Sequence, residues 1–170
     1  MRYSRPEPLT REHVRDRFDC GDHALNDWPQ RYALVSQAAD AARVYVTAEV
    51  DSEVVVGYYA LAAAQVVPRD APARLGKGQP ASRPIPAVLL TRLAVDLGHQ
   101  GADIGRSLVQ DAIARAVATA DTVGVRAILV HAKDDELREW YAQFGFQPSP
   151  TDPLHMVLLM KDARRTLSVD

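Results

Sequence analysis

The sequence is poor in cysteine, the residue whose disulfide bonds stabilise small secreted folds. Only one of its 170 residues is a cysteine, Cys20, which excludes an internal disulfide framework and a thiolate cluster for zinc. No stretch approaches the roughly 18 uncharged apolar residues of a membrane span. The N-terminal segment MRYSRPEPLTREH is charged and lacks the apolar core of a secretory signal. We therefore expect a cytoplasmic protein without a membrane partner.

A strong charge of one sign is also lacking. The net charge is −2, so no global basic field points to nucleic acid. Lysine supplies only three of the 20 cationic residues and arginine the rest. The planar fork of arginine suits phosphate, but a high-GC genome also favours arginine and alanine codons, and we give that explanation more weight. The length and the apolar fraction of 47% predict a single domain over residues 1–170.

Hydrophobic periodicity predicts helices first and then alternating strands and helices. Thr10 and Asp22 are typical helix caps, and Pro29 predicts a break near Trp28 in the second helix. An amphipathic helix is expected over 106–122 and another over 134–144, ended by Gly145. Strands are expected at 43–50, 54–67, 87–96, 125–132 and 154–161. Residues 68–86 form a long loop rich in Pro, Gly, Ala and Arg. This order predicts an α/β (α+β) fold with a mixed sheet.

A glycine-bearing turn over 98–105 separates the third strand from the amphipathic helix. The N–H groups at a helix start have no partner within the helix, and glycines allow an anion to approach the backbone closely. The turn lacks the Gly-Lys-Ser/Thr of a nucleotide-phosphate loop and the three-glycine spacing of a dinucleotide fingerprint. On spacing alone, an anion site and a plain strand-to-helix turn both stay open.

Two blocks of sequence resemble the GNAT acetyltransferases. Leu93-Ala94-Val95-Asp96 followed by Gln100 to Arg106 resembles the motif that binds the pyrophosphate of acetyl-CoA, and Trp140 to Phe146 resembles the later tyrosine and Gly-Phe block. The resemblance covers about residues 9–160. It implies a GNAT fold with helices on both faces of the sheet, acetyl-CoA as co-substrate and no metal. The cofactor-binding residues it implies are Leu93, Ala94, Val95, Gln100, Gly101, Ala102, Asp103, Ile104, Gly105 and Arg106.

Five separated blocks resemble, more narrowly, the GNAT toxins of bacterial toxin–antitoxin pairs. They are 18–21 with Leu25-Asn26, 56–61, 92–96, 130–132 and 148–150. This resemblance implies acetylation of the amine of aminoacyl-tRNA, inhibition of translation and a ribbon-helix-helix antitoxin, and it leaves a homodimer open. Arg74, Lys77, Arg83 and Arg92 become candidate contacts to tRNA phosphates, although plain solvation explains the loop residues equally well. The alternatives are a GNAT acting on a small-molecule amine or a protein N-terminus, and a weakly active GNAT-like binding module.

Tyr141 is the residue that the resemblance makes catalytic, because a phenol O–H can donate a proton to the departing CoA thiolate. The alternative is that Tyr141 only packs beside Phe144. No general base stands out. His99 and His131 are candidate proton carriers, although a histidine on a central strand such as His131 is more often a core residue. Asp103 stands where the motif has a glycine, and its carboxylate would oppose a pyrophosphate.

Overall fold

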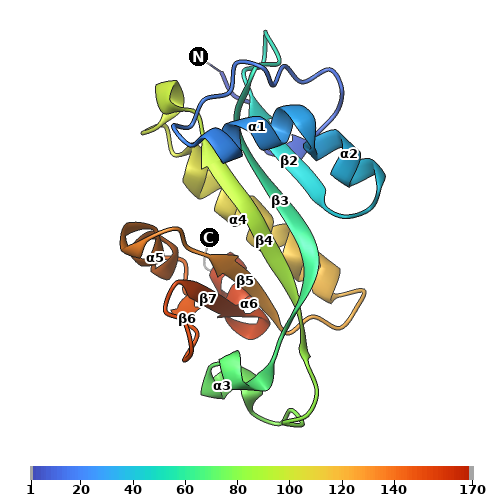
Figure 1. Ribbon diagram of the computed structural model, residues 1–170, viewed down its shortest axis with the longest axis vertical. Helices are drawn as coiled ribbons and strands as arrows, with labels where there is room; N and C mark the ends of the chain where they lie inside the picture. The colour runs from blue at the N-terminus through green and yellow to red at the C-terminus, as the bar shows by residue number, and fades with distance from the viewer. Residues whose placement is uncertain (1, 169–170) are drawn as a thin grey trace. The chain divides into compact units, whose positions relative to one another are not determined.

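The computed structural model describes residues 2–168 and contains a mixed sheet with helices (Figure 1). The hydrogen-bonded strand order is β1-β2-β3-β4-β5-β7-β6, with β4 and β5 parallel and β2–β3 and β5–β7 antiparallel. The strands are β1 (Glu7–Pro8), β2 (Arg43–Ala48), β3 (Val55–Val66), β4 (Ile85–Val95), β5 (Ala127–His131), β6 (Gln147–Pro148) and β7 (His155–Leu159). The predicted fold class is therefore confirmed.

Six α-helices and two short 3-10 helices accompany the strands within residues 2–168. The α-helices are α1 (His23–Arg31), α2 (Ala33–Ala38), α3 (Ala73–Gly76), α4 (Ile104–Ala120), α5 (Asp135–Ala142) and α6 (Met160–Ser168), and the 3-10 helices span Pro68–Asp70 and Leu97–His99. In this part of the chain no helix combines the length and apolarity needed to cross a bilayer. Contacts divide the chain into two compact units, one of Met1–Ala62 with Thr91–Ala112 and the other of Ala63–Leu90 with Ile113–Asp170.

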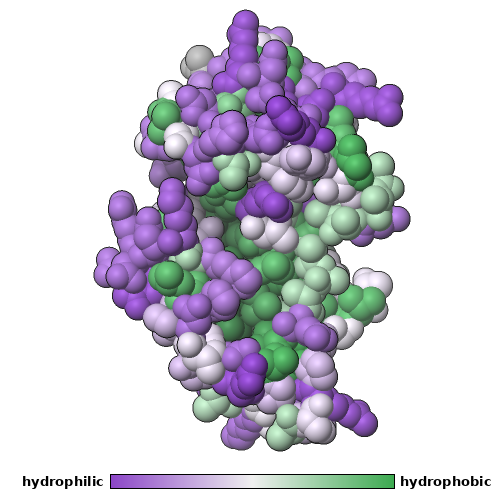
Figure 2. Space-filling view, in the orientation of Figure 1, coloured by the Kyte–Doolittle hydropathy of each residue, from purple (hydrophilic) through white to green (hydrophobic). Residues whose placement is uncertain are grey.

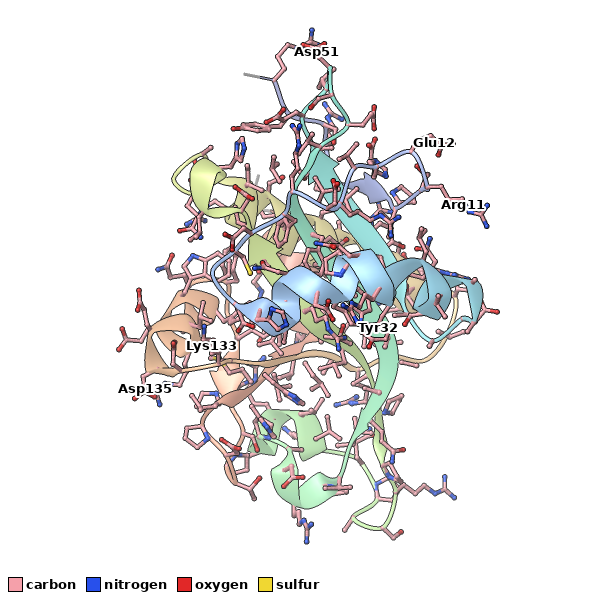
Figure 3. The ribbon with its side chains drawn as sticks, turned by 45° about the horizontal axis from the view of Figure 1, so that its top comes forward. Arg11, Glu12, Tyr32, Asp51, Lys133 and Asp135 are labelled. Atoms are coloured by element: carbon pink, nitrogen blue, oxygen red, sulfur yellow. The ribbon has the colours of Figure 1, made fainter. Side chains whose placement is uncertain are left out.

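In the first unit, helices pack on both faces of the β2–β3 pair. Val46 pairs with Tyr58, and both belong to a buried cluster that also contains Trp28 of α1, so α1 covers that face (Figure 1). Gly57 points to the opposite face because side chains alternate along a strand. A Cβ at Gly57 would lie 2.9 Å from Ile104 Cγ2, so this glycine lets the first turn of α4 approach the sheet closely. The β2–β3 turn ends in the projecting Asp51 (Figure 3).

In the second unit, an apolar cluster joins the β5–β7 pair to α3. Leu75 and Ile85, which both lie within the long loop predicted over 68–86, are fully buried and pack with Ala127 and Val157. The loop itself is shorter than expected because a 3-10 helix and α3 occupy its first half. Hydrophilic side chains project at the lower end of Figure 2, where this segment lies.

Two sequence expectations about helices are wrong. No helix starts at Thr10, because the Thr10 N–H donates to His13 Nδ1 at 3.0 Å and the segment forms turns instead. Arg11 and Glu12 project from these turns (Figure 3). At the other end, the last strand stops at Leu159 and α6 follows at once, although no helix was predicted there.

The predicted break at Pro29 is also wrong, for a reason that lies in another strand. Helix α1 runs through Pro29 to Arg31. Proline has no N–H, so the Leu25 carbonyl four residues earlier loses its partner within the helix. The buried Tyr58 hydroxyl donates to that carbonyl oxygen at 2.7 Å and replaces the missing donor. A side chain from β3 thus keeps α1 intact.

We expect this compensation to be measurable as a coupling between Tyr58 and Pro29. Tyr58→Phe leaves the Leu25 oxygen without a donor and should lower the free energy of unfolding by about 1–3 kcal/mol. In a Pro29→Ala background the loss should be smaller, because the alanine N–H can donate to the same oxygen. Denaturant unfolding of both single variants and the double variant measures the coupling. Equal losses in the two backgrounds would contradict the account.

Candidate active site

The glycine turn lies at the end of β4, beyond the point where that strand has a parallel neighbour. The ladder between β4 and β5 ends with the pair Leu90 and Val130, and β4 continues to Val95. Leu93, Ala94 and Val95 are in this extension, so the structure places them where the sequence predicted backbone groups for a cofactor. The Gln100 amide donates to the Val95 carbonyl at 3.2 Å and folds the turn back on the strand.

The backbone of the turn fits an anion. Gly101 has a φ of +88°, and no heavy atom lies within 4 Å of where its Cβ would be, so that side of the turn is open. Helix α4 starts at Ile104 and is 17 residues long, so its N-terminal amides and dipole favour negative charge beside the turn. The predicted residues from Gln100 to Arg106 therefore form one continuous cradle.

Asp103 adopts the conformation that explains why the family motif has glycine at this position. Its φ is +60°, in the left-handed region that side chains disfavour. Aspartate tolerates this region better than most residues. Its carboxylate is exposed and makes no hydrogen bond or ion pair with residues 2–168. The charge is thus turned to solvent, which reduces but does not abolish its opposition to a bound anion.

A network of side chains around Asp96 holds the strand end that leads into the turn. The Asp96 carboxylate accepts hydrogen bonds from the Gly98 N–H and the Asp19 N–H, both at 2.9 Å. The Asp19 carboxylate accepts in turn from the Gly21 N–H and from the Asn26 amide. These two hydrogen bonds lower the pKa of Asp19, so it stays ionised at neutral pH. The 18–21 block and Asn26, which carried the resemblance, act here as positioning residues.

Sequence reasoning assigned no role to Asp19, Asn26 or Gly57. Only Asp96 could have been found from the sequence. It follows a strand and stands two residues before a glycine, a pattern typical of a turn in which the aspartate side chain accepts a hydrogen bond from a backbone N–H. The partnership of Asp19 with Asp96 spans 77 residues, so no local pattern could reveal it.

Tyr141 lies on α5 in the second unit and is 7% exposed. Its ring packs edge-on against Trp140 and Phe146, so its packing partners are not Phe144 alone. Burial raises the pKa of Tyr141 to about 12, and the phenol is therefore protonated throughout the physiological range. Its hydroxyl makes no hydrogen bond to residues 2–168 and so remains available as a donor. The α5 start is marked by the projecting Lys133 and Asp135 (Figure 3).

The two candidate proton carriers differ in their surroundings. Contacts at both ring nitrogens hold the His99 side chain in place. Its Nδ1 lies 2.7 Å from the Tyr3 hydroxyl, and its Nε2 lies 3.5 Å from a Glu49 carboxylate oxygen. His131 is exposed at the end of β5, so the expectation of a core histidine is wrong. It stacks on His155 with ring centroids 4.1 Å apart. Partial burial and the charge of His155 lower the pKa of His131, which favours its neutral form.

The four predicted phosphate contacts lie in different settings. Arg74 and Lys77 line one cavity of the second unit, and Arg83 is exposed in the same unit. Arg92 belongs to the first unit and lies over the Trp28 ring at 4.3 Å from its centroid, a cation–π contact that holds its side chain. The structure therefore brings together only Arg74 and Lys77.

One group of residues in the described chain could in principle hold a metal ion: Glu7, His13 and Glu53. The Thr10 N–H donates to His13 Nδ1, so the proton of the neutral ring must be on Nε2, which lies 2.8 Å from the Glu7 carboxylate. A metal at Nε2 would require the other tautomer and would break the bond from Thr10. The arrangement is therefore that of a hydrogen-bonded anchor for the N-terminal segment.

The mixed sheet, the strand extension and the glycine cradle define an acetyltransferase of the GNAT class. The profile described as "Acetyltransferase (GNAT) domain" matches residues 40–148, and the chain belongs to this family. It is 46% identical over 162 residues to the tRNA-acetylating toxin of Mycobacterium tuberculosis, covering 95% of each chain.

Two further relatives agree. The chain is 31% identical to the probable toxin TacT of Sinorhizobium fredii, covering 89% of this chain and 88% of that protein. It is also similar to the structure of a tyrosine-to-phenylalanine mutant of the toxin AtaT bound to acetyl-CoA and to the C-terminus of the antitoxin AtaR. That similarity has a TM-score of 0.81 and 25% identity, and it covers 98% of both chains. The family resemblance predicted from the sequence is confirmed.

Replacing Asp103 by glycine should tighten acetyl-CoA binding and stabilise the fold. The change removes a carboxylate beside the cradle, which should improve affinity roughly five- to tenfold, more at low salt than at high. It also removes a side chain from a left-handed residue, which should raise the melting temperature. Asp40→Gly is the matched control, because Asp40 has a φ of +59° and the same charge but follows α2.

Titration calorimetry at two salt concentrations, with thermal unfolding, tests both effects. The control should leave acetyl-CoA affinity unchanged, and its gain in stability should be smaller because it also loses the ion pair between Asp40 and Arg43 at 2.6 Å. Weaker binding by Asp103→Gly at both salt concentrations would show that the carboxylate supports the cradle.

Proposed function

We propose that this protein is an acetyl-CoA-dependent N-acetyltransferase that acetylates the amino group of aminoacyl-tRNA and thereby inhibits translation. The observation that carries the proposal is the 46% identity, over 95% of both chains, to a tRNA-acetylating toxin. The geometry supports it, because the cradle at the start of α4 suits the pyrophosphate of acetyl-CoA. The near full-length likeness favours aminoacyl-tRNA over a small-molecule amine or a protein N-terminus as acceptor.

The predicted residues of the strand end and of the turn have distinct roles in this proposal. When bound, acetyl-CoA supplies an acetyl group activated as a thioester. The amides of the turn from Gly101 to Gly105 bind its diphosphate, and the backbone edge of Leu93, Ala94 and Val95 binds the extended arm. Gln100 holds the turn against Val95. Because the cradle is built of backbone groups, its selectivity is for charge and shape.

Tyr141 acts as the proton donor in the transfer step. The substrate nitrogen forms a bond to the acetyl carbon while the carbon–sulfur bond breaks, and the Tyr141 O–H donates its proton to the departing sulfur. The proton lost by the nitrogen passes to solvent and restores the phenol. A dedicated base is not required, because an unperturbed α-amino group has a pKa of about 7.7–8.0 and an ester lowers it further. Much of the acceptor is therefore neutral near pH 7.

The proposal extends to partners and location. The relative AtaT has been solved with the C-terminus of its antitoxin AtaR, which supports a protein antitoxin for this chain. We infer that this antitoxin is of the ribbon-helix-helix class. Aminoacyl-tRNA is consumed at ribosomes, so the cytoplasm is the location that fits the substrate. A homodimer is compatible with this arrangement.

The direct test is acetyl transfer from labelled acetyl-CoA to charged and uncharged tRNA. The wild-type protein should label only the charged form, and Tyr141→Phe should lower turnover roughly 10²-fold, since it removes a positioned acid. Binding of acetyl-CoA should stay near the wild-type value. Tyr32→Phe is the matched control, because Tyr32 is 52% exposed (Figure 3) and should leave turnover unchanged.

Labelling of uncharged tRNA, or of neither form while a simple amine is acetylated, would contradict the proposed substrate. An unchanged single-turnover rate for Tyr141→Phe would remove the phenol from the mechanism. Failure of the wild-type protein to bind acetyl-CoA at all would favour a GNAT-like binding module.

A further inference from the structure

The second unit contains a cavity whose polar lining is entirely basic. Its volume is about 410 Å³, and five of its lining residues are cationic: Arg74, Lys77, Arg126, Lys161 and Arg164. Among residues 2–168, no acidic side chain lines it. These residues come from α3 and the residue after it, from the residue just before β5 and from the first turns of α6. Segments far apart in the sequence thus contribute cations to one concave surface.

Neutralisation by neighbouring carboxylates is incomplete. Arg74 makes a two-pronged ion pair with Asp162, at 2.9 and 3.0 Å, and Arg164 lies 3.6 Å from an Asp121 carboxylate oxygen. Lys77, Arg126 and Lys161 form no ion pair with residues 2–168. Within the described chain, the five lining cations therefore outnumber the two carboxylates that pair with them.

Arg126 adds a donor that is not satisfied. Its Nη2 donates to the Leu75 carbonyl at 3.0 Å, which fixes the guanidinium, while its Nε is buried and has no hydrogen-bond partner in the described chain. A buried donor without an acceptor is costly, and an oxyanion that enters the cavity can accept from it after a small movement of the side chain. Fixed guanidinium groups match phosphate geometry well.

Helix α6 adds positive potential to that of the cationic side chains. It starts at Met160, whose N–H donates to the Arg126 carbonyl at 2.8 Å, and the other amides of its first turn have no partner within the helix. The helix has nine residues, and its N-terminal end forms part of the lining. The helix dipole and the cations therefore act on the same space.

From these observations we infer that the cavity binds phosphate groups of the RNA backbone, as a second anchoring point for the tRNA substrate. The inference rests on the proposed function for the identity of the RNA. The lining contains no aromatic side chain on which a base could stack, and its apolar members are Val125, Leu159 and Met160. A nucleotide would therefore gain little beyond its phosphates, whereas backbone phosphates need only positive charge and donors. Arg74 and Lys77, predicted as phosphate contacts from the sequence, belong to this site.

The test is the salt dependence of binding of uncharged tRNA. The double variant Lys77→Glu, Lys161→Glu changes two exposed side chains without ion-pair partners, so folding should be unaffected. Each lost phosphate contact removes nearly one unit from the slope of log K against log salt, so the slope should fall by about 1–2. Affinity at about 0.1 M salt should fall at least tenfold. Arg69→Glu is the control, because Arg69 is 85% exposed in the same unit and outside the cavity, and its slope should match the wild type.

Two results would overturn the inference. Wild-type affinity and slope for the double variant would show that the RNA does not use this cavity. Stoichiometric binding of inorganic phosphate that the double variant loses, together with unchanged tRNA binding, would assign the cavity to a small phosphate compound instead. Acetylation of charged tRNA by the wild-type protein, measured on the same preparation, keeps this outcome separate from a failure of the proposed function.

Discussion

The geometry of the cradle depends on the hydrogen bonds that the Asp96 carboxylate accepts. This carboxylate lies where β4 ends and accepts from two backbone N–H groups, one in the turn that follows and one at Asp19. Backbone pairing reinforces the junction, since the Asp96 N–H donates to Val56 and the Leu97 N–H donates to the Asp19 carbonyl. A cradle made of backbone amides binds an anion only if those amides are held in place beforehand. One side chain thus connects the N-terminal segment, the central strands and the turn before α4.

Two buried tyrosines share a similar environment but differ in their hydrogen-bond partners, and only Tyr141 has a proposed chemical role. Burial raises the pKa of both Tyr58 and Tyr141, so both are phenols at neutral pH. The Tyr58 hydroxyl is committed to the Leu25 carbonyl that Pro29 leaves unpaired. The Tyr141 hydroxyl has no acceptor among residues 2–168 and can donate to a substrate. The presence or absence of a partner, more than the pKa, distinguishes a structural phenol from an acid.

Local patterns predicted those parts of the fold whose causes are local. The alternation around Val44 and Val46 predicted a half-buried strand. Gly145 has the φ of +98° typical of a residue after a helix, although α5 ends at Ala142, two residues before the predicted end. Pro29 misled the prediction because the donor that preserves α1 comes from β3. Helix α6 did have a signal, the apolar spacing of Met160, Ala163 and Leu167, but it follows the last strand without a turn.

The candidate site divides in the same way. The sequence could predict the turn after β4 and a helix that carries Tyr141, because the motif residues there are contiguous; their roles toward acetyl-CoA stay predictions. Of the basic cavity, only Arg74 and Lys77 were predicted as phosphate contacts. The cavity itself was not predictable, because Arg74 and its partner Asp162 are 88 residues apart and Arg126 falls inside the strand predicted over 125–132. The exposure of His131 was likewise hidden, since it depends on β5 ending at that residue.

The affinity of acetyl-CoA for Asp96→Ala, measured by calorimetry well below the melting temperature of the variant, tests the central claim most directly. Loss of the two hydrogen bonds that Asp96 accepts should weaken acetyl-CoA binding by about tenfold or more. Without them the turn is not held in place beforehand, so part of the binding free energy is used to order it. Asp51→Ala, at the tip of the β2–β3 turn, removes the same charge away from the cradle and should bind as the wild type does (Figure 3). Wild-type affinity in Asp96→Ala would show that the cradle forms without this anchor and would contradict the account.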